Sequence, residues 1–143
     1  IEFMPFTGNR WSNNKVFTYQ EMLDIIQTKY QIEHLPGKAS DTAKAYRVAG
    51  QLGTFAVIST MSQPFCGGCN RLRITADGKM KNCLFSENET DLLTAFRKGE
   101  DIVQLIRNNV LSKAKELGGQ FTTDTGHLQP ESIHNRSMIT IGG

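Results

Sequence analysis

The chain has 143 residues and a formal net charge of +2 at pH 7, which allows one ordinary domain or one domain with part of another. Hydrophobic residues make up 38% of the sequence. With glycine also counted as apolar the composition is that of a globular protein, so wholesale disorder is not expected. No run approaches the ~20 apolar residues of a membrane-spanning helix, which excludes an integral membrane protein of that kind.

The first five residues already have the pattern of a β-strand. Ile-Glu-Phe-Met-Pro predicts a short buried strand closed by Pro5. No initiator methionine or signal-peptide pattern precedes it, and we expect the chain to be the C-terminal portion of a longer protein. Thr18 and Glu21 form a capping-box pattern, which predicts a helix over about residues 18–30. A polar linker over residues 31–42 follows.

After the linker, the hydrophobic pattern predicts two β-hairpins and then two helices. The first hairpin pairs residues 43–49 with 54–60, the second runs from Arg71 to Leu84, and the helices cover about 90–98 and 100–117, with Gly118 ending the last. We therefore expect the α+β class, with an antiparallel sheet built from hairpins and helices packed on it.

The cysteines indicate a metal site. There are three, an odd number, which argues against a closed disulfide framework. They are Cys66-Gly-Gly-Cys69 and, thirteen residues later, Cys83. Zinc would need a fourth ligand from His127 or His134. An iron–sulfur cluster on three thiolates would instead keep one iron open for a substrate atom. The spacing alone does not decide between these metals.

The register of the second hairpin can be argued from its turn. A two-residue loop mixes polar and apolar side chains on both faces, whereas a three-residue loop pairs Arg71 with Cys83 and Arg73 with Lys81. One face then carries Arg71, Arg73, Thr75, Lys79, Lys81 and Cys83, and the other Leu72, Ile74, Met80 and Leu84, with Asn82 the exception. Two guanidinium groups beside a metal site suit a phosphate or another anion. The alternative is a solvated strand face paired with nearby acids.

Several separated motifs together resemble the C-terminal part of one family. They are Glu2-Phe3-Met4-Pro5, Gly8-Asn9-Arg10-Trp11, the run from Phe65 to Gly78, Cys83-Leu84-Phe85, Asn135-Arg136-Ser137-Met138 and the terminal Ile141-Gly142-Gly143. The combination resembles the molybdenum-cofactor biosynthesis protein A family, the radical-SAM GTP 3′,8-cyclases. The resemblance spans essentially the whole chain and is highly specific, whereas Cys-x-x-Cys alone would not be.

This resemblance implies a fold and a division of the chain. Residues 1–30 would be the last strand and helix of an incomplete α/β, TIM-like barrel, and residues 31–143 a C-terminal domain of antiparallel hairpins and helices ending in a Gly-Gly tail. Family members carry two 4Fe–4S clusters, of which the N-terminal one cleaves S-adenosylmethionine. Its Cys-x3-Cys-x2-Cys motif is absent from this sequence. We therefore expect this chain alone to be inactive in radical generation.

The resemblance also implies roles for individual residues. Cys66, Cys69 and Cys83 match the ligands of the second 4Fe–4S cluster, which binds GTP through its open iron. Arg71, Leu72 and Arg73 match residues that contact GTP, Leu72 through its backbone. Gly142 and Gly143 match a tail that reaches the active site, and Met4 lies beside the place where the family binds S-adenosylmethionine.

The function that the resemblance implies is conversion of GTP to a cyclised pterin precursor in molybdenum cofactor biosynthesis. The partners it implies are cyclic pyranopterin monophosphate synthase downstream and a homodimer, with no membrane or nucleic-acid partner. An oxygen-sensitive cluster suggests a reducing compartment, either bacterial cytoplasm or mitochondrial matrix. Two alternatives stay open: a zinc module of three cysteines and one histidine that binds nucleic acid or protein, and a radical-SAM maturase that acts on a peptide.

Overall fold

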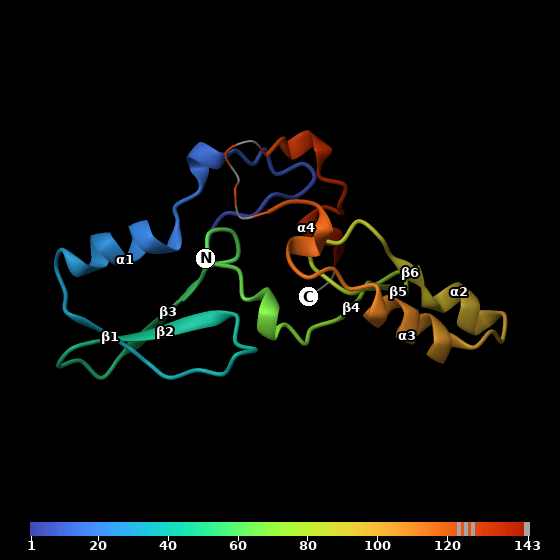
Figure 1. Ribbon diagram of the computed structural model, residues 1–143, viewed down its shortest axis with the longest axis horizontal. Helices are drawn as coiled ribbons and strands as arrows, with labels where there is room; N and C mark the ends of the chain where they lie inside the picture. Colours follow the sequence, from blue (N-terminus) through green and yellow to red (C-terminus); the bar gives the residue numbers. More distant parts are fainter. Residues whose placement is uncertain (123, 125, 127, 142–143) are drawn as a thin grey trace. The chain divides into compact units, whose positions relative to one another are not determined.

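The computed structural model describes residues 1–122, 124, 126 and 128–141, and it consists of two compact units. The first unit contains residues 1–4 and 11–69, and the second contains residues 5–10 and the chain from residue 70 onward. Each unit has one three-stranded antiparallel sheet and at least one helix (Figure 1). The predicted α+β class is confirmed by this arrangement. The expectation of one sheet built from both hairpins is wrong, because each hairpin pairs with a different third strand, β1 or β6.

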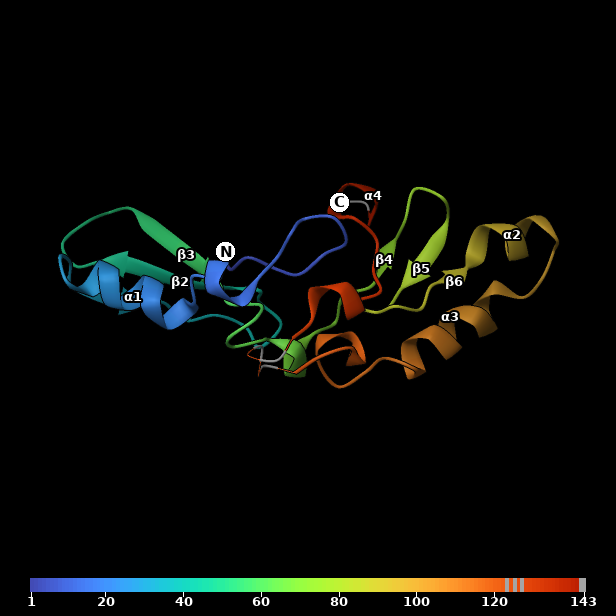
Figure 2. The same ribbon diagram turned by 90° about the horizontal axis from the view of Figure 1, so that it is seen from above.

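The first unit is built from one helix and one sheet. Its elements are the 3-10 turn η1 (Asn13–Lys15), α1 (Tyr19–Gln27), β1 (Ile32–His34), β2 (Ala43–Val48), β3 (Thr54–Ile58) and the 3-10 turn η2 (Cys66–Gly68). The strand order is β1-β2-β3, with both neighbouring pairs antiparallel. Helix α1 lies along this sheet in both views (Figures 1 and 2).

Helix α1 begins as the sequence predicts. The Thr18 side chain accepts a hydrogen bond from the Glu21 backbone N–H, and the Glu21 carboxylate accepts one from the Thr18 N–H at 2.8 Å. The core of the unit joins Tyr19 and Leu23 of the helix to Tyr46 and Val57 of the sheet. The capping box and the first hairpin are thereby confirmed.

Two predictions for the first unit are wrong. Residues 32–34, expected in a linker, form β1, whose Ile32 pairs with Val48 of β2. Residues 1–5 form no strand, although the Glu2 N–H donates to the Ile58 carbonyl at 3.1 Å. The buried Glu2 carboxylate accepts hydrogen bonds from the N–H groups of Tyr19, Met61 and Ser62 at 2.7, 2.6 and 2.9 Å. These side-chain hydrogen bonds, rather than a strand ladder, hold the segment in place.

In the second unit, the described residues form three short strands, three α-helices and two 3-10 turns. They are β4 (Arg73–Ile74), β5 (Lys79–Lys81), β6 (Thr90–Asp91), α2 (Leu92–Arg97), α3 (Ile102–Leu111), η3 (Leu117–Gly119), η4 (Pro130–Ser132) and α4 (Met138–Ile141). Strand β5 is the centre of the sheet, with β4 and β6 as antiparallel neighbours. The sequence did not predict β6, whose two residues are too few to leave a periodic pattern.

The hairpin of β4 and β5 has the predicted register. Arg73 pairs with Lys81 and Ile74 with Met80. The expected pair of Arg71 with Cys83 does not form, because β4 begins at Arg73 and the chain bends after Lys81. The Thr75 N–H donates to the Lys79 carbonyl at 2.8 Å, which leaves residues 76–78 as a three-residue loop. Gly78 closes this loop with φ +75°, the left-handed conformation that such a turn requires.

Helix α3 ends six residues earlier than expected. In a longer helix the Asn109 carbonyl would accept from the Lys113 N–H, but here it accepts from Asn82 Nδ2 at 2.8 Å and from the Ser112 hydroxyl at 2.9 Å. Gly118 is therefore not the cap of α3 and lies in η3 with φ +68°. Among the described residues, no helix has the length and apolar character needed to cross a membrane.

Candidate functional site

The two cysteines of the first unit lie on a tight turn. Cys66 opens η2, and the Cys69 N–H donates to the Cys66 carbonyl at 3.1 Å. Both thiols are reduced and half-buried. A Cys-x-x-Cys turn of this kind presents two sulfurs from one short loop, the arrangement common to zinc and iron–sulfur sites.

The second glycine of this turn packs tightly against the backbone of the same unit. A Cβ built on Gly68 would lie 1.9 Å from the Ala39 carbonyl oxygen and 2.5 Å from its carbon. A Cβ on Gly67 would meet nothing within 4 Å. Only Gly68 is therefore required for the chain from Cys66 to Cys69 to lie against residues 39–40.

Cys83 follows β5 in the second unit and is also reduced and half-buried. Its carbonyl accepts hydrogen bonds from the Ser86 N–H at 3.3 Å and the Ser86 hydroxyl at 3.0 Å. The loop after β5 is thus fixed by its own backbone and a serine. Because Cys66 and Cys69 belong to the first unit, shared ligation by the three thiols stays a prediction.

The polar face of the hairpin is more buried than a solvated strand face would be. Lys81 has no exposed surface and Thr75 is 3% exposed, whereas Leu72 and Ile74 on the edge strand are 45% and 60% exposed. Arg71 and Arg73 are half-buried, and the Arg71 carbonyl accepts from the Lys113 ammonium at 3.0 Å. Lys81 and Thr75 are therefore not part of a solvated face, whereas the roles of Arg71 and Arg73 stay predictions.

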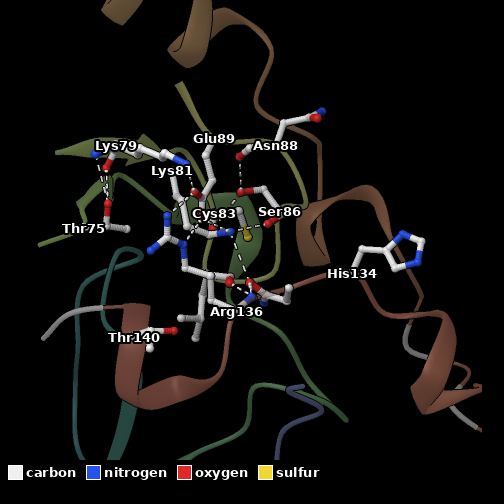
Figure 3. A network of polar contacts seen from close by, with 12 residues as sticks. Thr75, Lys79, Lys81, Cys83, Ser86, Asn88, Glu89, His134, Arg136 and Thr140 are labelled. Atoms are coloured by element: carbon white, nitrogen blue, oxygen red, sulfur yellow. Dashed lines mark hydrogen bonds and ion pairs between the residues drawn. The ribbon is translucent and has the colours of Figure 1, made fainter. Parts of the chain in front are cut away.

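An ion-pair network that the sequence did not reveal organises this face. Arg136 donates to both oxygens of Glu89, from Nε to Oε1 at 2.5 Å and from Nη2 to Oε2 at 2.6 Å, and Nη2 also donates to Asp77 at 2.8 Å. Lys81 Nζ lies 3.6 Å from Glu89 Oε1 and donates to the Ser86 carbonyl at 2.5 Å. Figure 3 shows Lys81, Glu89 and Arg136 gathered close to Cys83 and Ser86.

The neighbouring residue fixes the same segment to the hairpin. Asn135 donates from Nδ2 to the Leu84 carbonyl at 2.9 Å, and its Oδ1 accepts from Lys81 Nζ at 3.2 Å. Asn135 and Arg136 belong to the Asn-Arg-Ser-Met motif, but more than 45 residues separate them from their partners. No local sequence pattern could have identified those partners.

The charges of the network shift several pKa values. The hydrogen bonds from Arg136 hold the pKa of Glu89 below its ordinary range, and they also lower the pKa of Asp77, with help from Thr75. Burial lowers the pKa of Lys81, and the Glu89 carboxylate opposes that shift. Both acids are therefore carboxylates at neutral pH, and Arg136 is their principal partner.

We expect acid to destabilise the chain through these two carboxylates. Their pKa values are lower in the folded protein than the ordinary 4.5 and 3.8, so the unfolded chain binds more protons once the pH falls below about 4.5. Their contribution to the free energy of unfolding is complete at neutral pH. It is lost as the pH falls through their pKa values in the folded protein. Urea unfolding at pH 7, 4 and 3 measures this fall in the free energy of unfolding.

Arg136→Gln should remove part of this pH dependence, because it removes the main cause of both shifts. Glu21 and Asp91 also have lowered pKa values, but through Thr18 and Thr94, so they contribute equally in both proteins. Arg47→Gln, an exposed arginine in the first unit, is the matched control. If the free energy of unfolding of Arg136→Gln fell with pH as steeply as that of the wild type, this account would be wrong.

The histidines do not complete a zinc site among the described residues. The His134 side chain is 69% exposed, its Nδ1 lies 3.2 Å from Glu87, and Figure 3 shows it directed away from Cys83. His127 lies outside the described residues. In the described part of the chain, no group of three or more His, Cys, Asp or Glu side chains is arranged to hold a metal ion.

The remaining predicted site residues lie elsewhere. Met4 is half-buried in the first unit, apart in sequence from the cysteine turn. Gly142 and Gly143 lie outside the described residues. The structure thus brings Arg73, Lys81 and the loop of Cys83 together within the second unit, and leaves the roles of Met4 and of the tail as predictions.

The three cysteines are donors of the kind that an iron–sulfur cluster takes. Cluster irons take thiolate ligands, and the three cysteines of this chain are all reduced. The close approach of Ala39 to Gly68 fixes the turn that carries two of them. Residues Cys66, Cys69 and Cys83 are therefore the ones that could hold such a group.

Known proteins resemble this chain along its length. The profile of the family described as "Molybdenum Cofactor Synthesis C" matches residues 1–118. "Molybdenum cofactor biosynthesis protein 1" of Mus musculus is 42% identical over 99% of this chain and 22% of its own length. "GTP 3′,8-cyclase, mitochondrial" of Arabidopsis thaliana is 36% identical, and "GTP 3′,8-cyclase" of Peptoclostridium acidaminophilum 35%, each over 100% of this chain and 36% and 41% of their own lengths. The chain thus spans about a fifth to two fifths of these relatives.

Proposed function

The chain belongs to the Molybdenum Cofactor Synthesis C family, and on that premise we propose that it forms the substrate-binding, second-cluster part of a GTP 3′,8-cyclase. In the longer protein, residues 1–30 adjoin the radical-SAM barrel and residues 31–143 form the domain that binds a 4Fe–4S cluster and GTP. The names of two relatives support GTP as the substrate. The product is a cyclised pterin precursor, passed to cyclic pyranopterin monophosphate synthase.

The observation that carries this proposal is the register of the second hairpin. It sets Arg73 opposite Lys81, on the face that leads to Cys83. Among the described residues, four cations (Arg73, Lys79, Lys81 and Arg136) lie there with three carboxylates (Asp77, Glu89 and Asp91). An excess of positive charge beside a thiol suits a ligand with a polyphosphate tail. Arg71 and Arg73 bind that tail, and the backbone of Leu72 contributes a further contact.

The proposed cofactor is a 4Fe–4S cluster on Cys66, Cys69 and Cys83. When bound, it supplies an iron with an open coordination position to which a substrate heteroatom can bind. The residues of this chain hold the nucleotide in one orientation and exclude water from it, which suppresses side reactions of a reactive substrate. Met4 borders the S-adenosylmethionine site, and Gly142 and Gly143 approach the substrate as a tail.

The partners and the compartment are proposed on the same basis. The longer protein forms a homodimer and uses a second 4Fe–4S cluster with S-adenosylmethionine. It works in bacterial cytoplasm or in the mitochondrial matrix, and the printed name of the Arabidopsis relative supports the latter for eukaryotes. Without the Cys-x3-Cys-x2-Cys motif, this chain alone produces no 5′-deoxyadenosine.

Anaerobic reconstitution with iron and sulfide tests the cluster. The 143-residue chain should turn brown and hold about four iron and four sulfide ions. Cys66→Ser, Cys69→Ser and Cys83→Ser should each lose most of the iron, whereas His134→Ala should keep it. A colourless protein that binds one zinc ion, and loses it with His134→Ala or His127→Ala, would instead establish the zinc module.

Titration of the reconstituted chain with GTP tests the substrate site. Arg73→Gln should weaken GTP binding at least ~10-fold, because a charge-assisted bidentate contact to phosphate is lost. Arg47→Gln removes the same charge from an exposed position of β2, outside the hairpin, and should leave the affinity unchanged. Equal affinities of the two variants would contradict the placement of GTP on the hairpin.

A further inference from the structure

Arg136 binds two of the three described acids beside the polar face of the hairpin, Glu89 and Asp77. The third, Asp91, lies opposite Lys79 in β6. The Arg136 guanidinium group forms the short hydrogen bonds to Glu89, at 2.5 and 2.6 Å, and the one to Asp77 at 2.8 Å. The lysines lie farther from the same carboxylates: Lys81 is 3.6 Å from Glu89, and Lys79 is 3.9 Å from both acids. The directional contacts of the acids therefore belong to Arg136 and not to the lysines.

Two other cations of this face stay available to a ligand. Arg73 is half-buried, and its guanidinium makes no hydrogen bond or ion pair to any side chain that the structure describes. The Lys79 side chain is 38% exposed, and its ion pairs with Asp77 and Glu89 are long, at 3.9 Å. Its cross-strand neighbour is Asp91 of β6, so a ligand would bind Lys79 in competition with these acids. Since Arg73 pairs with Lys81, Lys79 is its diagonal neighbour on the same face, close enough for long side chains to converge on one anion.

We propose that Arg136 is a positioning residue of a polyphosphate site on this face: by binding Glu89 and Asp77, it leaves Arg73 and Lys79 free to bind the triphosphate of a nucleotide. This inference rests on the proposed function and names the residue that keeps its substrate site cationic. Arg136 does not touch the ligand. It acts through the carboxylates that would otherwise oppose the ligand.

The electrostatic argument follows from the charges that remain when Arg136 is removed. The Glu89 side chain is only 14% exposed, so water screens its negative charge poorly. Without Arg136, the carboxylate would form closer ion pairs with Lys79 and Lys81. Its negative charge would also repel a triphosphate within a Debye length. Removing the carboxylate as well should relieve both effects, because the acid and Arg136 cancel each other.

The test is a double-mutant cycle with inorganic triphosphate and GTP as probes, measured by calorimetry on the reconstituted chain. Arg136→Gln should weaken the binding of both probes by about 10-fold or more. Glu89→Gln alone should leave binding unchanged or slightly tighter. The double variant Arg136→Gln/Glu89→Gln should return to within about threefold of the wild type. The loss caused by Arg136→Gln should also diminish as salt rises.

Other roles of Arg136 predict other results. If Arg136 touched the ligand, or only stabilised the fold, Glu89→Gln would not restore binding, and that outcome overturns the proposal. Circular dichroism reports whether each variant is folded. Should Arg136→Gln not fold, Arg136→Lys replaces it: it keeps the charge but loses the two-pronged contact, and should show a smaller loss that Glu89→Gln again relieves.

The Arg73→Gln variant separates this inference from the proposed function. If Arg73→Gln weakens binding but the cycle shows no rescue, only the role of Arg136 is overturned. If neither Arg73→Gln nor Arg136→Gln changes the affinity, or if the wild-type chain binds neither probe, both the role of Arg136 and the proposed nucleotide site on the hairpin are wrong. Iron content is measured on the same samples and reports on the cluster independently.

Discussion

Gly68→Ala is expected to unfold the cysteine turn and abolish iron loading of the chain. A Cβ at this position would lie 1.9 Å from the Ala39 carbonyl oxygen, 2.5 Å from its carbon and 3.2 Å from the Ser40 nitrogen. These are backbone atoms that no rotamer change can move, so the turn or residues 39–40 must shift. We expect a loss of at least about 3 kcal/mol in the free energy of unfolding, from a clash inside packed backbone.

Gly67→Ala provides a matched control one residue away. A Cβ on Gly67 would have no atom within 4 Å, and its φ is not positive. The change in stability should stay within about 1 kcal/mol, since alanine also restricts the unfolded chain. Urea unfolding and iron quantification on both variants make the comparison. Equal stability and equal iron content would show that the approach of Ala39 to Gly68 does not hold the turn.

The parts of the fold that the sequence predicted are those set by neighbouring residues. The capping box needs only Thr18 and Glu21, three positions apart, and both of its hydrogen bonds are present. The hairpin register follows from the length of its loop and from alternation along the strands, and Arg73 does pair with Lys81. In both cases the energy that decides the structure comes from residues close in sequence.

The parts that were not predicted depend on contacts between distant residues. Strand β1 has three residues and forms because it pairs with β2, with Ile32 opposite Val48. The segment at Glu2 is held by amides from residues 19, 61 and 62 rather than by a ladder. Arg136 lies 47 positions from Glu89. A local pattern carries no information about such partners, so these features required the tertiary structure.

The candidate site divides in the same way. The sequence identified the cysteines by their Cys-x-x-Cys spacing, and Arg71 and Arg73 by their alternation on one face of the hairpin. It did not identify the carboxylates Asp77 and Glu89 or their partner Arg136, because acids and arginines are common on every surface. It placed Lys81 on the polar face of the hairpin but did not predict that the residue has no exposed surface. The burial of a lysine is decided by what packs on its strand.

Lys81→Met is expected to destabilise the second unit by about 3 kcal/mol, because it leaves buried acceptors without a donor. The Lys81 ammonium donates to the Ser86 carbonyl at 2.5 Å and to Asn135 Oδ1 at 3.2 Å, and lies 3.6 Å from Glu89. Methionine fills the space of the stem but donates to none of these groups. For a chain of this size the loss corresponds to a fall in Tm of about 10 °C.

Lys79→Met removes the same charge from the same strand and serves as its control. The Lys79 side chain is 38% exposed and lies 3.9 Å from each of its acidic partners, Asp77 and Glu89. Exposed ion pairs at such distances contribute less than about 1 kcal/mol. A large difference in the free energy of unfolding between the two variants therefore reports on burial and lost hydrogen bonds rather than on charge. If thermal unfolding placed both variants within about 1 kcal/mol of each other, the Lys81 ammonium would not be the group that joins Asn135 to the loop after β5.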